Sequence, residues 1–206
     1  MPDVMPSFAR MYPNIQIELK EGRGDYLESL LANDQVDFCI MNTPISYRNV
    51  FFEVILKEHI FLVMHKDNRL LTEFDRSTQL GRGYLKHFDI TRLRELPQTL
   101  IMLKKGQHLT GTVQNLLNKY DLRFDSIFET ENLTTAINLV SNGIGITFVP
   151  ENGIINKPME NVAYFTVDSP PITGELAAVY KNNIPLGWAA KLFVEHIKQY
   201  YSSYEM

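Results

Sequence analysis

The run from Glu131 to Pro150 has the clearest pattern of apolar and polar positions in the chain. Apolar residues recur at helical spacing in its first half, which predicts a helix capped at its start by Asn132. Asn142-Gly143 supplies the left-handed residue that commonly ends a helix. The segment Ile144–Val149 is short, apolar and rich in β-branched residues, which predicts a buried strand that ends where Pro150 removes a donor. Helix, glycine turn and strand together indicate an α/β protein.

The N-terminal part of the chain continues this alternation. Residues 3–12 have apolar positions at helical spacing and predict a first helix, and Ile15–Lys20 alternate with period two, as a half-buried strand does. A second helix is predicted from Asp25, with Glu28 at the spacing of a capping box. A buried strand over Val36–Met41 follows. Strand, helix and strand in this order predict a crossover with parallel pairing.

The rest of the chain predicts further strands and helices. Residues 50–57 and 59–64 are expected to form two strands with a tight connection, whereas residues 68–98 show no clean period and predict a loop with short helical pieces. The other expected strands are 98–103, 124–130, 162–167 and 175–181, and the other expected helices follow Gly106 and Pro185.

The order of these elements predicts two α/β lobes. The last helix has no partner left in the second lobe, so the chain is expected to return to the first. His65 and Ala178 are the expected hinge residues. The expected bounds are 1–60 plus 182–206 for lobe I, 66–174 for lobe II, and 59–65 and 175–181 for the crossing strands.

Composition narrows the class of protein. Twenty Lys and Arg against 24 Asp and Glu give a formal net charge of −4, and basic residues gather nowhere densely enough to predict DNA-backbone binding by this chain. The only cysteine is Cys39, which excludes an internal disulfide and suits a reducing compartment. No apolar run reaches the roughly 18 residues of a membrane helix, and we expect no leader peptide. These features predict a cytoplasmic domain that does not enter membranes.

Two segments resemble a known family. The segment LVSNGIGITFVP resembles the LV-x-x-G-x-G-x-x-x-x-P pattern in the effector-binding domain of LysR-type transcriptional regulators. The fragment MP-x-x-x-x-F-x-x-x-YPNIQIELKEG, followed by L-x-x-x-x-VDFCI, resembles the opening of the same domain. The resemblance extends through most of the chain. It implies a fold of two Rossmann-like lobes joined by two crossing strands, similar to type II periplasmic binding proteins, with a ligand cleft between the lobes.

The resemblance also implies function and partners. A small-molecule effector would bind between the lobes, and the protein would form homodimers or homotetramers through the first helix and a second-lobe helix. Exposed Phe8, Met11 or Tyr12 would fit such an interface. In the family a strand inside the sheet precedes the first helix. We expect that strand, the linker helix and the winged helix-turn-helix to be missing here, so DNA would be contacted only through the missing N-terminal domain.

Polar residues follow three of the predicted strands, and ligands of α/β sheets collect at such carboxyl ends. These junctions suit a small oxygen-rich or anionic effector, although asparagine and threonine are also ordinary helix caps. Thr147 and Phe148 lie at the end of a buried strand, where core packing competes with ligand contact. The resemblance places effector contacts at the junctions of Gln107 and Thr134. The candidate effector-binding residues are Asn42, Thr43, Gln107, His108, Thr110, Asn132, Thr134, Thr147 and Phe148.

Two other functions stay open. No nucleophile, zinc, Walker or dinucleotide motif is present, and the five histidines show no ligand spacing, so we expect no catalysis, metal or cofactor. The first alternative is a periplasmic-type solute receptor. The second is a deaminase-like or dehydratase-like enzyme on the same scaffold, with a general acid or base such as His108. If Glu129 and Glu131 point inward, the effector carries an amine instead of an acid.

Overall fold

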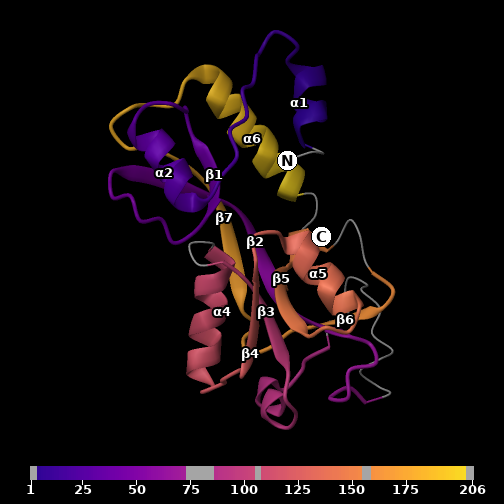
Figure 1. Cartoon of the computed structure of the whole chain (residues 1–206). Coiled ribbons are helices and arrows are strands. Elements are labelled where there is room, and N and C mark those ends of the chain that lie inside the picture. The colour runs from indigo at the N-terminus through magenta and orange to yellow at the C-terminus, as the bar shows by residue number, and fades with distance from the viewer. Residues whose placement is uncertain (1–3, 73–85, 105–107, 155–158, 203–206) are drawn as a thin grey trace. The chain divides into compact units, whose positions relative to one another are not determined.

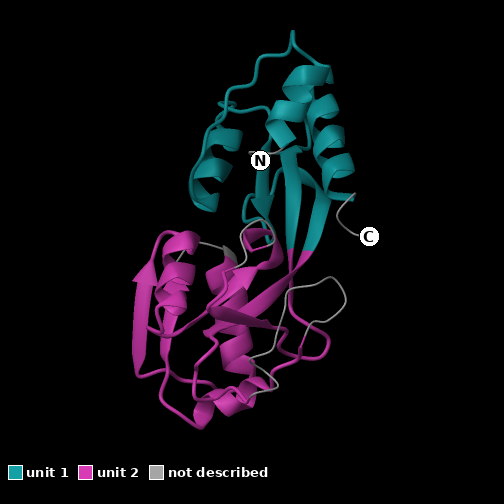
Figure 2. Cartoon of the chain, turned by 90° about the vertical axis from the view of Figure 1, so that its right-hand side faces the viewer, with its two compact units in different colours: residues 1–57, 175–206 teal, residues 58–174 magenta. Residues whose placement is uncertain are grey.

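The computed structural model describes residues 4–72, 86–104, 108–154 and 159–202. The chain divides into two compact units, which Figure 2 distinguishes by colour: unit 1 is residues 1–57 and 175–206, and unit 2 is residues 58–174. Two strands run from one unit into the other, β2 (Val50–His65) and β7 (Thr173–Lys181). No helix within the described ranges is long and apolar enough to cross a membrane.

Unit 1 contains a small antiparallel sheet covered on both faces. Strand β1 (Cys39–Asn42) pairs antiparallel with β7, and β7 lies next to β2 in the sheet order. Helices α1 (Val4–Met11) and α6 (Trp188–Ser202) cover one face, where the rings of Phe8 and Phe193 lie 4.7 Å apart. Helix α2 (Gly24–Ala32) packs on the other face through Leu31, beside Cys39 and Met41.

Unit 2 is built on a mixed sheet in the order β2–β5–β3–β4, with β6 on the other edge of β2. Strand β3 pairs parallel with β4 and with β5, whereas β2 pairs antiparallel with β5 and β6. The strands and helices of unit 2 are β3 (Thr99–Leu103), β4 (Ser126–Thr130), β5 (Ile146–Pro150), β6 (Val162–Phe165), α4 (His108–Lys119), α5 (Leu133–Ser141) and the 3-10 helices η1 (Ile90–Arg94) and η2 (Glu151–Gly153), in addition to the part of β2 that lies in this unit.

Helices cover both faces of this sheet (Figure 1). Helix α4 and the 3-10 helix η1 pack on one face through Val113, Leu116 and Leu93, over strand residues such as Leu100. Helix α5 packs on the opposite face, against Ile101 among others. Successive strand residues point to opposite faces, so a sheet covered on both sides needs continuous apolar strands. This explains why β3 and β5 lack an alternating pattern.

The central run of the sequence folds as its pattern predicts. Helix α5 starts after Asn132, whose side-chain oxygen accepts hydrogen bonds from the backbone N–H groups of Thr134 and Thr135, at 2.8 and 3.3 Å. Gly143 has a φ of +77°, in the left-handed region expected after a helix. At Gly145 a Cβ atom would lie 2.3 Å from the backbone oxygen of Thr99, so only glycine fits beside β3.

Two predicted features of the N-terminal part are wrong. Residues 15–20 form no strand, so the predicted parallel crossover is absent and β1 pairs antiparallel with β7 instead. Residues 50–57 and 59–64 are not two strands but the single strand β2. Strand β2 continues through the Lys57-Glu58 step, where Glu58 is buried and its carboxylate accepts a hydrogen bond from the backbone N–H of Asn152 at 2.8 Å.

The predicted capping box of α2 is also wrong. The helix starts at Gly24, and its cap residue Arg23 makes no side-chain capping bond. The Asp25 carboxylate accepts a hydrogen bond from the adjacent N–H of Tyr26. Glu28 accepts a hydrogen bond from the backbone N–H of Ser46 at 2.8 Å, in a segment distant in sequence. A tertiary partner therefore replaces the local one.

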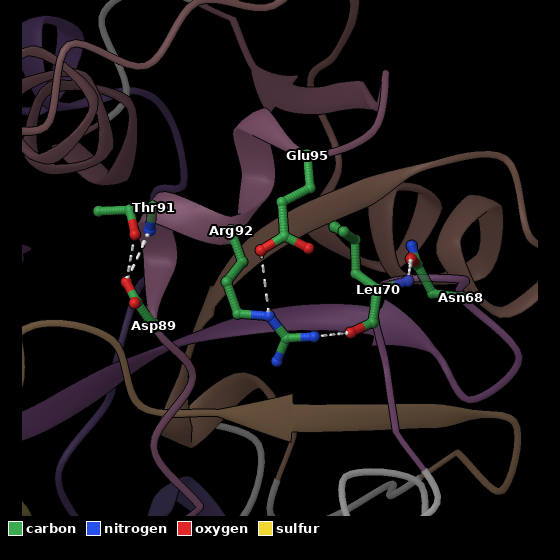
Figure 3. Close-up of polar contacts among 6 residues, drawn as sticks. All are labelled: Asn68, Leu70, Asp89, Thr91, Arg92 and Glu95. Carbon is green, nitrogen blue, oxygen red and sulfur yellow. Dashed lines mark hydrogen bonds and ion pairs between the residues drawn. The ribbon is translucent and has the colours of Figure 1, made fainter.

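The loop predicted over residues 68–98 contains η1 and is fastened by side chains, as Figure 3 shows; residues 73–85 of it lie outside the described part. The Asp89 carboxylate accepts hydrogen bonds from the N–H and hydroxyl of Thr91, at 3.0 and 2.7 Å, which caps η1. Arg92 donates to the backbone oxygen of Leu70 and pairs with Glu95 at 3.6 Å. These bonds tie η1 to the chain that leaves β2.

The unit boundaries fall between Lys57 and Glu58 and between Gly174 and Glu175. His65 lies at the far end of β2, inside unit 2, and Ala178 is buried in unit 1 opposite Ile40. The crossing strands expected over 59–65 and 175–181 are thus parts of β2 and β7. A hinge at His65 or Ala178 stays a prediction.

Replacing Gly145 by alanine should lower the free energy of unfolding by about 1–3 kcal/mol, because the new methyl group would press on the Thr99 carbonyl. Gly111→Ala is the matched control: Gly111 lies within α4 with open space around its Cβ position, so alanine should stabilise by about 0.5–1 kcal/mol. Urea denaturation measures both. Equal effects of the two substitutions would contradict this account of Gly145.

Burial raises the pKa of the Glu58 carboxyl, the hydrogen bond from Asn152 opposes this, and the Glu151 charge adds to the rise. The folded state therefore holds this proton more tightly than the unfolded chain. Its stabilising effect is complete below the ordinary pKa of about 4.3 and is lost as pH rises through the folded-state pKa. Glu58→Gln should therefore gain stability over the parent as pH increases.

The measurement is urea denaturation of the parent and the variant from about pH 4 to about pH 7, the interval around and above the ordinary carboxyl pKa. Glu21→Gln is the control, because Glu21 is an exposed carboxylate of the same type. If both variants follow the parent with the same pH slope, burial of Glu58 does not govern this part of the pH dependence.

Candidate functional site

Two polar strand-to-helix junctions lie at the same edge of the unit 2 sheet. Because β3 and β4 are parallel and Leu103 lies opposite Thr130, both strands end together. The backbone N–H of Lys104 donates to the oxygen of Thr130 at 2.9 Å, which extends the pairing past the strand ends. Helices α4 and α5 both begin just beyond this edge. The positive ends of two helix dipoles therefore gather at one edge, an arrangement that favours anions.

The α5 junction is organised by Asn132. Besides capping α5, Asn132 donates its own N–H to the hydroxyl of Thr130 at 3.2 Å. The Thr134 side chain is exposed in the first turn of the helix. Asn132 therefore holds the junction in shape, while Thr134 offers a hydroxyl to solvent beside the helix N-terminus.

The α4 junction is described in part. Gln107 lies outside the described residues, and of His108 only the backbone, as the first residue of α4, is described. The Thr110 hydroxyl donates to the backbone oxygen of Leu103 at 2.8 Å, so it ties the first turn of α4 to the end of β3. This bond fixes the helix start relative to the strand.

Thr147 and Phe148 lie inside the sheet, with 2% and 3% of their surfaces exposed. The Thr147 hydroxyl donates to the backbone oxygen of Ile101 on β3 at 2.8 Å, and Phe148 packs in the α4-side core. Both side chains stabilise β5, which pairs with β3 and therefore lies beside the junctions. Their contact with a ligand stays a prediction.

In unit 1 polar residues also follow a strand, β1, but no helix begins there, and the chain continues to β2. Asn42 is the last residue of β1 and is half-buried. The N–H of Thr43 donates to the backbone oxygen of Glu175 at 3.0 Å, and its hydroxyl donates to the Glu175 carboxylate at 3.4 Å. Thr43 is thus tied to the residue at which β7 enters unit 1.

Sequence reasoning missed one lysine beside the polar residues of each unit. In unit 2 the ammonium group of Lys104 lies 2.9 Å from the carboxylate of Glu131. In unit 1 the Lys57 ammonium lies 3.7 Å from the Glu175 carboxylate. Both pairs are partly exposed, so each is weak and exchangeable in water. The position of Lys104 directly after a strand was a usable signal; nothing local marked Lys57, because Glu175 is distant in sequence.

The described residues offer little for redox or metal chemistry. The Cys39 thiol is buried and donates to the backbone oxygen of Leu27 at 3.5 Å, and burial, with a smaller contribution from Glu28, raises its pKa to about 11. Reactive cysteines are thiolates, so this thiol is inert at neutral pH. Among the described residues, no three His, Cys, Asp or Glu side chains cluster as a metal site would require.

Comparison with known proteins identifies the family. A family model described as "LysR substrate binding domain" matches residues 1–202. The HTH-type transcriptional regulator YcgK of Bacillus subtilis is 26% identical over 200 residues, which cover 94% of this chain and 60% of that protein. A hydrogen peroxide-inducible genes activator of Haemophilus influenzae is 24% identical, covering 90% of this chain and 58% of that protein. The chain thus spans about 60% of the length of these relatives.

Solved structures show the same fold at low sequence identity. The BenM effector binding domain with its effector benzoate has a TM-score of 0.79 and 18% identity, and covers 100% of this chain and 87% of that chain. The Synechocystis CcmR regulatory domain in complex with 2-PG has a TM-score of 0.77 and 18% identity, with coverages of 97% and 90%. These domains have the two-lobe fold of type II periplasmic binding proteins. The chain therefore belongs to the LysR substrate-binding-domain family, the ligand-sensing regulatory domains of LysR-type regulators.

Proposed function

We propose that the chain senses a small-molecule effector on behalf of a LysR-type transcriptional regulator and catalyses no reaction. The observation that carries this proposal is the match of the family model to residues 1–202. The gathering of two helix N-termini at one edge of the unit 2 sheet supports it, because such an edge binds small polar ligands. DNA would be contacted through a domain outside this chain, and the regulator would act in the cytoplasm.

The proposed effector contacts come from both units. Unit 1 contributes Asn42 and Thr43, and unit 2 contributes the α4 and α5 junctions with Thr134. Strands β2 and β7, which run between the units, are the proposed hinge. The effector shifts the equilibrium between open and closed arrangements only as far as its affinities for the two differ. This change would then alter the spacing of the DNA-binding domains.

The charges at the junctions favour an effector with a carboxylate. The helix N-termini attract anions, and Lys104 can exchange its bond to Glu131 for one to a ligand carboxylate. Benzoate, in BenM, and shikimate, in QuiR, are both carboxylates bound by proteins of this fold. The runner-up is an amine, which would pair with Glu131 and with Glu129, an exposed residue of β4.

A peroxide response is a second candidate, since two relatives are named hydrogen peroxide-inducible genes activators. The chain has one cysteine, Cys39. A buried thiol with a pKa of about 11 supplies almost no thiolate to react with peroxide. We therefore propose binding of a small molecule, not thiol oxidation, as the signal sensed by this chain.

The proposed oligomer is a homodimer or homotetramer that uses α1 and a helix of unit 2. Met11 is 59% exposed, whereas Phe8 is fully buried against α6 and Tyr12 is half-buried beside it. Met11 is therefore the apolar side chain that α1 offers to a partner, and Phe8 is excluded from that role. A solute receptor or an enzyme on the same scaffold is less well supported, because the relatives are transcriptional regulators.

Thermal melting against small acids, amines, amino acids and sugars tests the function. An effector present at about 100 times its dissociation constant should stabilise the chain by about 2.7 kcal/mol, which raises the melting temperature by several degrees. We expect the stabilising compound to be a carboxylate, and we expect Lys104→Gln to weaken its binding. Lys66→Gln, on the chain that leaves β2, is the control. A cooperative melt that no compound shifts would contradict a preformed effector site.

Substitutions of Asn132 separate its capping role from ligand contact. Asn132→Ala should lower the free energy of unfolding by about 1 kcal/mol, because two N–H groups of α5 lose their acceptor. Asn132→Asp keeps the cap and the stability but adds a negative charge at the junction, so it should weaken binding of an acidic effector. Asn118→Ala, near the end of α4, is the control. If Asn132→Asp binds a carboxylate effector as tightly as the parent does, Asn132 is not part of the binding site.

A further inference from the structure

Unit 1 contains a cavity of about 240 Å³ at the end of its sheet where β1 begins and β7 ends. One wall is the chain from the end of α2 to β1, with Leu31 and residues 34–37. The other wall is the chain from the end of β7 to α6, with Lys181 and residues 184–187 (Figure 1). Both walls belong to unit 1, and none of the candidate effector-binding residues lines the cavity. The cavity is therefore separate from the polar edge of unit 2.

The volume and the apolar part of the walls limit the ligand. Pockets for drug-sized compounds have roughly 300–1,000 Å³, and a water molecule takes about 30 Å³, so this cavity suits a ligand of about eight non-hydrogen atoms. Leu31 and Val36 supply apolar surface on the α2 side, and Ile184 supplies it on the other wall. Ile184 is 48% exposed, so an apolar group that binds here removes a large side chain from water.

Lys181 supplies the positive charge of the cavity. Its side chain is only 13% exposed, and its ammonium group donates to the backbone oxygen of Ala32 at 2.9 Å and to the Asp34 carboxylate at 2.6 Å. The bond to Ala32 satisfies a carbonyl at the end of α2 and so holds the ammonium group in place. An ammonium group has three donors, so these two bonds to described residues leave one N–H for a ligand.

Asp37 supplies a carboxylate of the opposite charge. Neither its side chain nor that of Gln35 makes a hydrogen bond or ion pair with another described residue. Both side chains are exposed, so both can exchange water for a ligand. The cavity thus offers one ammonium N–H, one carboxylate and one amide to the same small ligand.

We propose that this cavity binds a free amino acid with a small apolar side chain. The ligand carboxylate accepts from Lys181, the ligand ammonium group donates to Asp37, and the ligand side chain packs on Leu31, Val36 and Ile184. Bonds between ionised groups are the strong ones, and a ligand with a single charge makes only one of the two. The inference goes beyond the proposed effector site of unit 2 and does not depend on it.

A titration of the isotope-labelled chain, followed by amide NMR shifts, tests the site. The probes are L-valine, L-leucine and two analogues of leucine: 3-methylbutylamine, which lacks the carboxylate, and 4-methylpentanoate, which lacks the amine. At least one of the two amino acids should give saturable shifts at residues 34–37 and 184–187. Each analogue should bind roughly tenfold more weakly than leucine or worse, because it loses one charge-assisted bond.

Substitution of the two charged residues separates their roles. Asp37→Asn should weaken amino-acid binding roughly tenfold and leave 4-methylpentanoate unaffected, because only the amine loses its partner. Asp125→Asn is the matched control, since Asp125 is an exposed aspartate of unit 2. Lys181→Gln should weaken the amino acids and 4-methylpentanoate but not 3-methylbutylamine. This variant also loses the bond to Ala32 and some stability, so the three compounds on the parent test the ammonium group without a substitution.

Four results would overturn the proposal. The first is the absence of saturable shifts at residues 34–37 and 184–187 with either amino acid up to about 10 mM. The second is binding of an analogue as tight as that of leucine, since the cavity would then not recognise both charges. The third is full affinity of Asp37→Asn for the amino acids. The fourth is a set of shifts confined to the α4 and α5 junctions and abolished by Lys104→Gln, which would assign the amino acid to the proposed effector site.

Discussion

The parallel pairing of β3 with both β4 and β5 is the constraint on which the polar edge of unit 2 depends. Parallel neighbours end at the same edge, so the helices that follow β3 and β4 begin side by side there. The pairing with β5 requires the close approach of Gly145 to Thr99, and the helices on opposite faces require strands apolar on both sides. The polar residues of the junctions lie at the ends of β3 and β4, beyond the two cores.

Interactions between sequence neighbours were predictable from the sequence. The Asn132 cap joins atoms two and three residues apart, and the glycine turn follows at once, so the whole of α5 and β5 can be inferred from one segment. The α/β fold and most of the later strands were likewise predictable from local patterns. Thr110 and Asn132 were expected where helices follow two strands, and they lie there because β3 and β4 are parallel and end at one edge; their contact with a ligand stays a prediction.

Features that depend on residues distant in sequence were not predictable. Glu28 accepts from an N–H 18 residues away, and Thr43 donates to a carboxylate 132 residues away. The buried Glu58 carboxylate accepts from the N–H of Asn152, 94 residues away, and no local pattern predicts this contact. Residues 15–20 show the opposite failure: Ile15 and Ile17 are half-buried as their alternation predicts, but Leu19 is exposed and the segment forms no strand.

The burial of Cys39 has a practical consequence for labelling. Cys39 carries the only thiol in the chain, and this thiol is buried with a raised pKa. A maleimide dye would therefore react with a cysteine introduced on the surface and not with Cys39. One such position in each unit would carry a donor and an acceptor fluorophore, with Cys39 left in place to keep its packing against Leu31 and Val179. The energy transfer between the dyes would then report the distance between the units in solution, with and without a small molecule.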